Sequence, residues 1–329
     1  MLKRFVVVVE VFYVDRANLL FMFLAMSKSG TFKGVMAATV PRGTTQPQWP
    51  EPSMIHCIGD SHSTFFSGKE QIAVDDSPSR PMPFFRVHHI GPALAFNLMK
   101  EGAVTRGREA FLEILDDEVP ANAWVMPVFG EIDCRAHIQI QAERQGKPIE
   151  RIIESCVANY VQFIDEILAK GYFVIGYNVI PSAPYKCKYR LKKKSLCPTY
   201  ASQKQRNRIT QHFNDLLRIE CDKRQLPFLE NFDLLLDSLG RTERKFYMDR
   251  MHLSIRAMPM TLERLGAMFP RCDFSLPVSY QAEIECSMAE VNQHERTLKA
   301  RMTKYWRWKY NSIKAVVHPK NLRTLFFRQ

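Results

Sequence analysis

MIHCIGDSHSTFFSG, residues 54–68, sets an apolar run directly against a glycine and a series of polar residues. A short apolar run bounded by turn residues indicates a buried strand, which ends here near Gly59. Two kinds of chemistry fit such a strand end. Ser61 is a candidate nucleophile, and Asp60 with His62 is a candidate pair of metal ligands.

Further apolar runs follow along the chain, and they alternate with helical patterns. Strands are predicted at 54–58, 84–89, 123–129, 172–179 and 226–229, and helices near 91–101, 106–117, 149–170 and 200–224. Segment 149–170 has the clearest helical period, with apolar residues three and four apart and Gly171 at its end. This alternation predicts an α/β fold, a three-layer α/β/α sandwich around a five-stranded parallel sheet.

The composition changes twice along the chain and predicts three parts. Residues 27–53 are rich in Ser, Thr, Gly and Pro, so 1–53 is expected to be an N-terminal extension and linker. The α/β domain is expected at 54–270. Residues 271–329 read as a helical C-terminal extension, acidic first and basic later.

The positive charge is concentrated in two places. The formal net charge is +12, and residues 185–208 and 296–329 contain Lys and Arg without any acid. Such basic segments can meet an anionic polymer, an anionic substrate or a membrane surface, or they can simply be solvated. No motif of a specific nucleic-acid-binding fold occurs, so specific nucleic-acid recognition is not expected.

The apolar N-terminal stretch does not read as a membrane span. Glu10, Asp15 and Arg16 interrupt it, and each is costly at the centre of a bilayer. The pattern also lacks the unbroken apolar core and the cleavage site of a signal peptide. A cytoplasmic protein is therefore expected, with a secreted or membrane-associated form left open.

Polar residues follow the predicted strands where each strand ends. In α/β sheets the ligand binds beyond the carboxyl ends of the strands, which points to positions 59–61, 91, 130–133 and 178–182. A late loop, MDRMHLS at 248–254, is expected to return to the same edge. A serine hydroxyl needs a base, and that base needs a third group to orient it. Ser61, His252 and Asp249 form such a set.

These blocks, in this order, resemble the SGNH or GDSL hydrolases, a flavodoxin-like group of esterases, lipases and carbohydrate deacetylases. The resemblance covers about residues 54–258 and rests on GDS at 59–61, IGPAL at 90–94, GEID at 130–133 and DRMH at 249–252. It implies Ser61 as nucleophile, His252 as base and Asp249 as orienting acid. It also implies that the N–H groups of Ser61 and Gly91 bind the oxyanion, that the substrate is an acyl ester, and that no cofactor is needed.

One position departs from the family pattern. Where the family has an Asn that donates to the oxyanion, this chain has Ile132, which carries no donor. Loss of one such donor costs about 10²–10³ in rate. Asn178 is the first candidate substitute and Arg135 the second. A turn role for Asn178, ahead of Pro181, is the alternative.

A polar pocket is expected around the nucleophile and the third block. Its candidate residues are Asp60, His62, Glu131, Asp133 and Arg135. The two acids of the third block can position the arginine, cap the following helix or bind substrate hydroxyls. For His62, a place in the pocket and a supporting or surface role both remain open.

Three other functions compete with the esterase. Asp60-x-His62 resembles the first metal block of calcineurin-like metallophosphoesterases, but the chain contains no Gly-Asn-His, and its eight cysteines form no C-x-x-C pair. No metal site is therefore predicted. An inactive domain of the same fold that binds glycans or a partner protein is a second possibility. Transfer of the acyl group to a glycan is the third.

Overall fold

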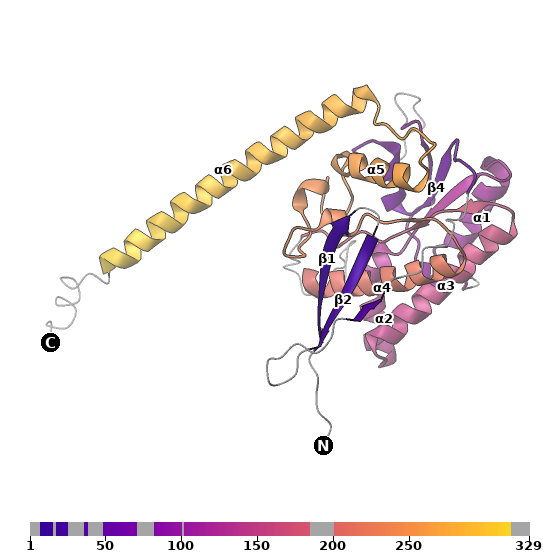
Figure 1. Cartoon of the computed structure of the whole chain (residues 1–329), viewed down its shortest axis with the longest axis horizontal. Helices are drawn as coiled ribbons and strands as arrows, with labels where there is room; N and C mark the ends of the chain where they lie inside the picture. Colours follow the sequence, from indigo (N-terminus) through magenta and orange to yellow (C-terminus); the bar gives the residue numbers. More distant parts are fainter. Residues whose placement is uncertain are drawn as a thin grey trace, which may run out of the picture. The chain divides into compact units, whose positions relative to one another are not determined.

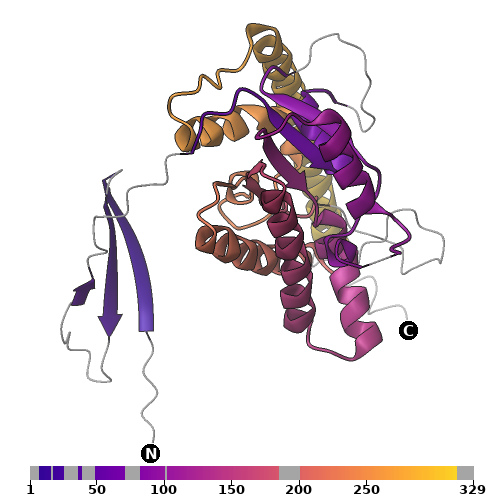
Figure 2. The same ribbon diagram turned by 90° about the vertical axis from the view of Figure 1, so that its right-hand side faces the viewer.

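The computed structural model describes residues 7–15, 18–25, 36–38, 49–70, 82–100, 102–184 and 201–316 (Figure 1). The chain divides into two compact units, Met1–Gln48 and Trp49–Gln329. The first unit is a three-stranded antiparallel sheet, in which β2 (Asn18–Ala25) lies between β1 (Val7–Asp15) and β3 (Met36–Ala38). Figure 2 shows β1 and β2 running side by side in opposite directions.

A parallel four-stranded sheet forms the centre of the second unit. Its order is β5 (Phe85–His89), β4 (Ile55–Gly59), β6 (Trp124–Val128) and β7 (Phe173–Val174). Every residue of β4 and β6 is buried. This explains why both strands appear in the sequence as almost continuous apolar runs.

The sheet has four strands and not the five that the sequence predicts. The last predicted strand, 226–229, contributes β9 (Phe228–Leu229), which pairs with β8 (Gly176–Tyr177) in a separate two-stranded parallel ladder. The chain changes partner within two residues. Ile175 donates its N–H to Val125 O of the main sheet, whereas Gly176 donates to Pro227 O. A Cβ on Gly176 would lie 2.7 Å from Phe228 and Cys221, so glycine permits this close approach.

Helices cover both faces of the sheet. They are α1 (Gly107–Glu118), α2 (Ile138–Gln145), α3 (Ile149–Ala169), α4 (Gln203–Lys223), α5 (Met258–Met268) and α6 (Val278–Val316). Ile58 and Val125 on one face of the sheet share a core cluster with α1, α3 and α4. Cys57 and Met126 on the other face share a second cluster with α5 and the first turns of α6.

The helix predicted at 91–101 is wrong. The structure has only a short 3-10 turn there, η2 (Ala95–Asn97), after Gly91 with φ +82°. The amides of Ala95 and Phe96 donate to the Asp133 carboxylate and not to a helical ladder. Hydrogen bonds to Asp133, which is distant in the sequence, therefore take the place of the hydrogen bonds of a local helix.

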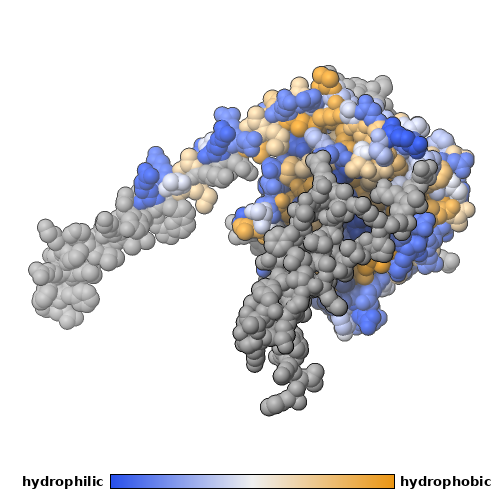
Figure 3. All heavy atoms as spheres, viewed as in Figure 1, coloured by the Kyte–Doolittle hydropathy of each residue, from blue (hydrophilic) through white to orange (hydrophobic). Residues whose placement is uncertain are grey.

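The core of the second unit continues past residue 270, into α6. Tyr280 and Ile284, in its first turns, are buried, while the described side chains from Arg296 to Tyr305 are exposed. Hydrophilic residues are spread along the coloured part of α6 in Figure 3. Among the described residues, no helix is both long and apolar enough to cross a membrane.

Candidate active site

Three parallel strands end together at one edge of the sheet. Gly59, the last residue of β4, lies opposite His89 of β5 and Val128 of β6. Beyond it, Ile90 N–H donates to Gly59 O at 3.0 Å. The segments that begin at Asp60, Gly91 and Phe129 therefore leave the sheet at the same edge.

The backbone geometry at the end of β4 requires Gly59 and Asp60, the first two residues of the GDS block. A Cβ on Gly59 would lie 2.1 Å from Val128 O, so only glycine fits between the strands. Asp60 is the N-cap of the 3-10 helix η1 (Ser61–Ser67), and its Oδ1 accepts the His62 N–H at 2.9 Å. This cap places Ser61 as the first residue of the turn, directly above the end of the strand.

A continuous chain of hydrogen bonds joins the serine to an acid 188 positions later in the sequence. Ser61 Oγ lies 2.8 Å from His252 Nε2, and His252 Nδ1 lies 2.8 Å from Asp249 Oδ2. Asp249 Oδ1 also accepts the N–H groups of Met251 and His252, both at 2.7 Å. Because a carboxylate accepts at Nδ1, the proton of the neutral imidazole stays there, and Nε2 is left to accept from the serine.

The environment favours the protonation states that a base and its orienting acid need. Burial is the largest cause that lowers the pKa of His252, and it outweighs the raising effect of Asp249. Burial raises the pKa of Asp249, but the hydrogen bonds from the backbone and ring of His252 outweigh it, so its pKa is lowered. At neutral pH the imidazole is uncharged and the carboxylate is ionised.

Hydrogen bonds to Glu70 and from Arg256 support the loop that carries His252, and the sequence does not indicate them. Glu70 accepts hydrogen bonds from Ser254 Oγ and from Ile255 N–H, the latter at 3.1 Å. Arg256 donates to Tyr247 O at 3.1 Å and, from Nη1, to Ser287 Oγ of α6 at 2.7 Å. Glu70 stands in a polar stretch without periodicity, so no pattern in the sequence marks it.

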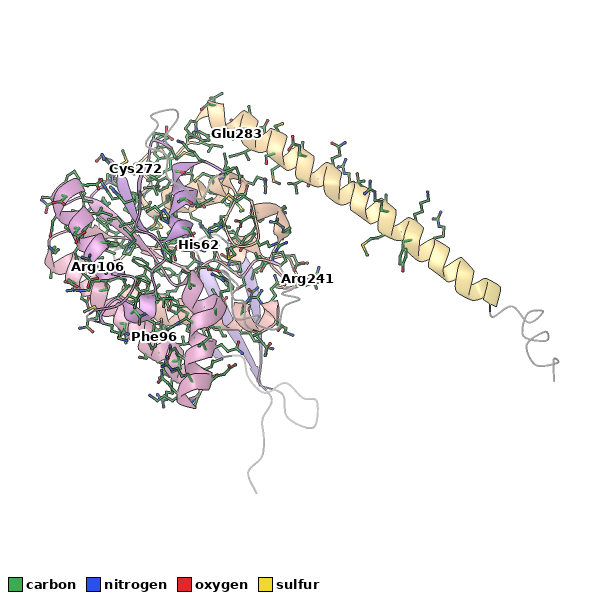
Figure 4. The ribbon with its side chains drawn as sticks, turned by 180° about the vertical axis from the view of Figure 1, so that it is seen from behind. His62, Phe96, Arg106, Arg241, Cys272 and Glu283 are labelled. Carbon is green, nitrogen blue, oxygen red and sulfur yellow. The ribbon has the colours of Figure 1, made fainter. Side chains whose placement is uncertain are left out.

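His62 lies behind the serine, against the third block. Its Nε2 is 3.1 Å from Glu131 Oε2, and its ring stacks on that of His252 with the centroids 4.8 Å apart. Figure 4 marks its position within the second unit. Arg135 Nε donates to both oxygens of Glu131, at 2.8 and 3.0 Å. The second candidate for an oxyanion donor is thus engaged with a buried acid.

Asn178 and Asp133 both form hydrogen bonds that connect separate segments of the fold. Asn178 is fully buried, accepts Asn231 N–H at 2.9 Å and donates to Val179 O at 3.3 Å. These bonds connect the segments after β8 and β9, and the expected role of Asn178 at the oxyanion stays a prediction. Asp133, equally buried, anchors η2, and burial raises its pKa to about 7.

Of the predicted pocket residues, three line one small pocket. Asp60, His62 and Glu131 share it with Asn178, whereas Asp133 and Arg135 are not part of its lining. Asp60 is fully buried, and burial raises its pKa to about 6. In the described part of the chain, no group of three or more His, Cys, Asp or Glu residues could hold a metal ion.

No protein-family model matches the chain, and no curated protein matches it. Solved structures that resemble it include a GDSL-like lipase from Bacteroides thetaiotaomicron (11% identity, 68% of this chain and 95% of that chain, TM-score 0.38). A catalytic mutant of an acetylxylan esterase from Geobacillus stearothermophilus is another (12%, 70% and 99%, TM-score 0.42). An α/β hydrolase enzyme from the metagenome of Lake Arreo is a third (9%, 68% and 97%, TM-score 0.41). The three likenesses are distant, with TM-scores of 0.38 to 0.42.

Proposed function

We propose that the chain is a serine-dependent esterase that acts on an acyl ester through Ser61, His252 and Asp249. The observation that supports this most is the chain of two 2.8 Å hydrogen bonds from Ser61 through His252 to Asp249. It lies at the edge of the sheet where three parallel strands end, and its imidazole is uncharged at neutral pH.

The reaction follows from this arrangement. Ser61 Oγ attacks the ester carbonyl carbon while its proton passes to His252 Nε2, and Asp249 stabilises the imidazolium that forms. The N–H groups of Ser61 and Gly91 hold the oxyanion. His252 then gives the proton to the leaving alcohol, and water hydrolyses the acyl-enzyme by the same steps. No cofactor takes part in this reaction.

The oxyanion site has fewer donors than the family pattern. Ile132 supplies none, Asn178 is bonded within the fold, and Arg135 is paired with Glu131. We therefore expect an enzyme about 10²–10³ slower than one with a third donor.

The substrate we favour is a short acyl group on a carbohydrate, because polar residues predominate after the strands. Transfer of that group to a sugar hydroxyl would use the same acyl-enzyme. The basic segments 185–208 and 296–329 favour an anionic substrate or surface. Lys192, Lys193 and Lys194 lie outside the described residues, and their neutralisation should weaken an anionic substrate more than a neutral one. We expect the protein in the cytoplasm.

The test is covalent labelling with a fluorophosphonate probe, which reacts with activated serines. Wild type should label, and Ser61→Ala and His252→Ala should not, with or without a chelator. Ser67→Ala is the matched control, because Ser67 Oγ donates to Thr64 O and meets no imidazole. Absence of labelling in the folded wild type would reject the esterase and favour a binding domain of the same fold.

A further inference from the structure

A second group of charged side chains lies behind the serine, and the reaction above does not use it. It consists of His62, Glu131 and Arg135, whose side chains are 8%, 7% and 9% exposed. Burying three ionisable groups is costly unless they are paired. Their position beside His252 suggests a role in its chemistry.

The contacts of Glu131 fix the proton on His62. Burial raises the pKa of Glu131, but Arg135 and His62 outweigh it and lower the value to about 2, so this acid is ionised. His62 therefore carries a proton on Nε2, which donates to Glu131 Oε2. Its Nδ1 is buried and has no hydrogen-bond partner among the described residues. A second proton can bind there without breaking a hydrogen bond.

His62 gains that proton more readily than a free histidine. Burial lowers its pKa, but the neighbouring charges of Glu131 and Asp60 outweigh burial, and the net shift is upward. The ring of His62, which becomes an imidazolium when Nδ1 binds that proton, stacks on the ring of His252 with an angle of 29° between the ring planes. Four groups surround His252. Ser61 lies at Nε2 and Asp249 at Nδ1, while His62 stacks on the ring. The charge of Glu131, beyond His62, raises the pKa of His252.

We propose that His62, held as an imidazolium by Glu131, is a positioning residue that makes protonated His252 a stronger acid. The site is thereby suited to esters whose leaving group is an unactivated alkoxide, such as that of a sugar. This inference rests on the proposed esterase function and adds the class of leaving group to it.

The charge of His62 affects the second half of each acyl transfer, in which the leaving group departs. When the tetrahedral intermediate collapses, the bond between carbon and the leaving oxygen breaks, and the proton moves from His252 Nε2 to that oxygen. A neighbouring positive charge disfavours the imidazolium and so favours this transfer. The same charge weakens His252 as a base towards Ser61. The net gain is therefore confined to leaving groups that need a proton, and a nitrophenolate does not.

The first experiment compares two substrates and three variants. His62→Phe keeps a stacked ring without charge, Glu131→Gln removes the counter-charge, and His212→Phe on α4 is the matched control. With glucose pentaacetate, kcat/KM should fall about tenfold in the first two variants, and with p-nitrophenyl acetate it should not fall, because attack by Ser61 then has the stronger base. Equal losses on both esters would reject the inference, because a purely structural role affects both alike.

The second experiment needs no turnover. Proton NMR titration of His252 in the resting protein should show its pKa about one unit higher in His62→Phe than in wild type. An unchanged value would also reject the inference. If wild type hydrolyses neither ester and the titration still shifts, the esterase proposal fails while the electrostatic coupling stands. If His62→Phe does not fold, His62→Gln, which also removes the charge and keeps Glu131, is titrated in its place.

Discussion

At the scale of single residues, Asp249 serves both the fold and the site. One oxygen of its carboxylate closes the turn by accepting two backbone amides, and the other holds the imidazole of His252. The turn therefore forms with the carboxylate already aimed at the ring. Local folding of the turn therefore also orients the ring of His252.

Replacing Asp249 by Asn should separate these two functions. The amide oxygen can still close the turn, but its NH₂ group cannot accept a proton from Nδ1, so the imidazole takes the wrong tautomer. The rate of fluorophosphonate labelling should fall by about 10³–10⁴.

Asp237→Asn is the matched control, because Oδ1 of Asp237 also accepts two backbone amides, from Leu239 and Arg241. Labelling of this control at the wild-type rate is expected. A comparable loss in both variants would mean that turn geometry, and not the tautomer, governs reactivity.

At the scale of elements, apolar runs predict the strands well and fail where a distant side chain takes part. β4, β5 and β6 lie within a residue or so of their predicted bounds. In β4 and β6, burial on both faces imposes the apolar pattern. The helix expected at 91–101 does not form, because Asp133 takes the amides of Ala95 and Phe96. No local pattern contains that information.

Asp133→Ala should therefore destabilise the protein. It leaves two backbone N–H groups without their acceptor, at about 1–3 kcal/mol each. Urea unfolding is best measured at pH 5, where Asp133, with its pKa raised to about 7, is uncharged in the fold.

Asp116→Ala provides the comparison, since it removes only an exposed pair with Lys170. Its effect should stay within about 1 kcal/mol. If Asp133→Ala is no more destabilising than this control, Asp133 does not anchor η2.

At the scale of the whole molecule, strand order predicts where the candidate site residues lie, but not which neighbouring side chains contact them. The topology of parallel strands brings Ser61, Gly91 and Glu131 to one edge, as motif order and strand ends indicate. The stacking of His62 on His252 and the bond from Glu70 to the histidine loop depend on three-dimensional packing. The sequence offers no period or spacing for such contacts.

The extent of the second unit gives a prediction at this scale. A chain that ends at Glu290 keeps Tyr280, Ile284 and the bond from Arg256 to Ser287, so it should label as the full chain does. A chain that ends at Pro270 loses three buried side chains, Phe274, Tyr280 and Ile284, each worth about 1.5–3 kcal/mol. Its melting temperature should be lower by several degrees. Equal melting temperatures for the two shortened chains would show that α6 adds nothing to the core.

The π-helical turn η3 (Asp133–His137) separates two demands on one stretch of chain. Ile138 N–H reaches back five residues to Asp133 O, so the turn holds one residue more than an α-helix would. Before it, Glu131 contacts His62, and after it, Ile138 enters the core. Each residue turns a helix by about 100° about its axis. The extra residue therefore changes the direction in which Glu131, before the turn, points relative to Ile138, after it. Substitutions can therefore change the residues before or after the turn independently. Deletion of one residue from the turn would rotate Glu131 relative to Ile138, so that the two could no longer keep both contacts.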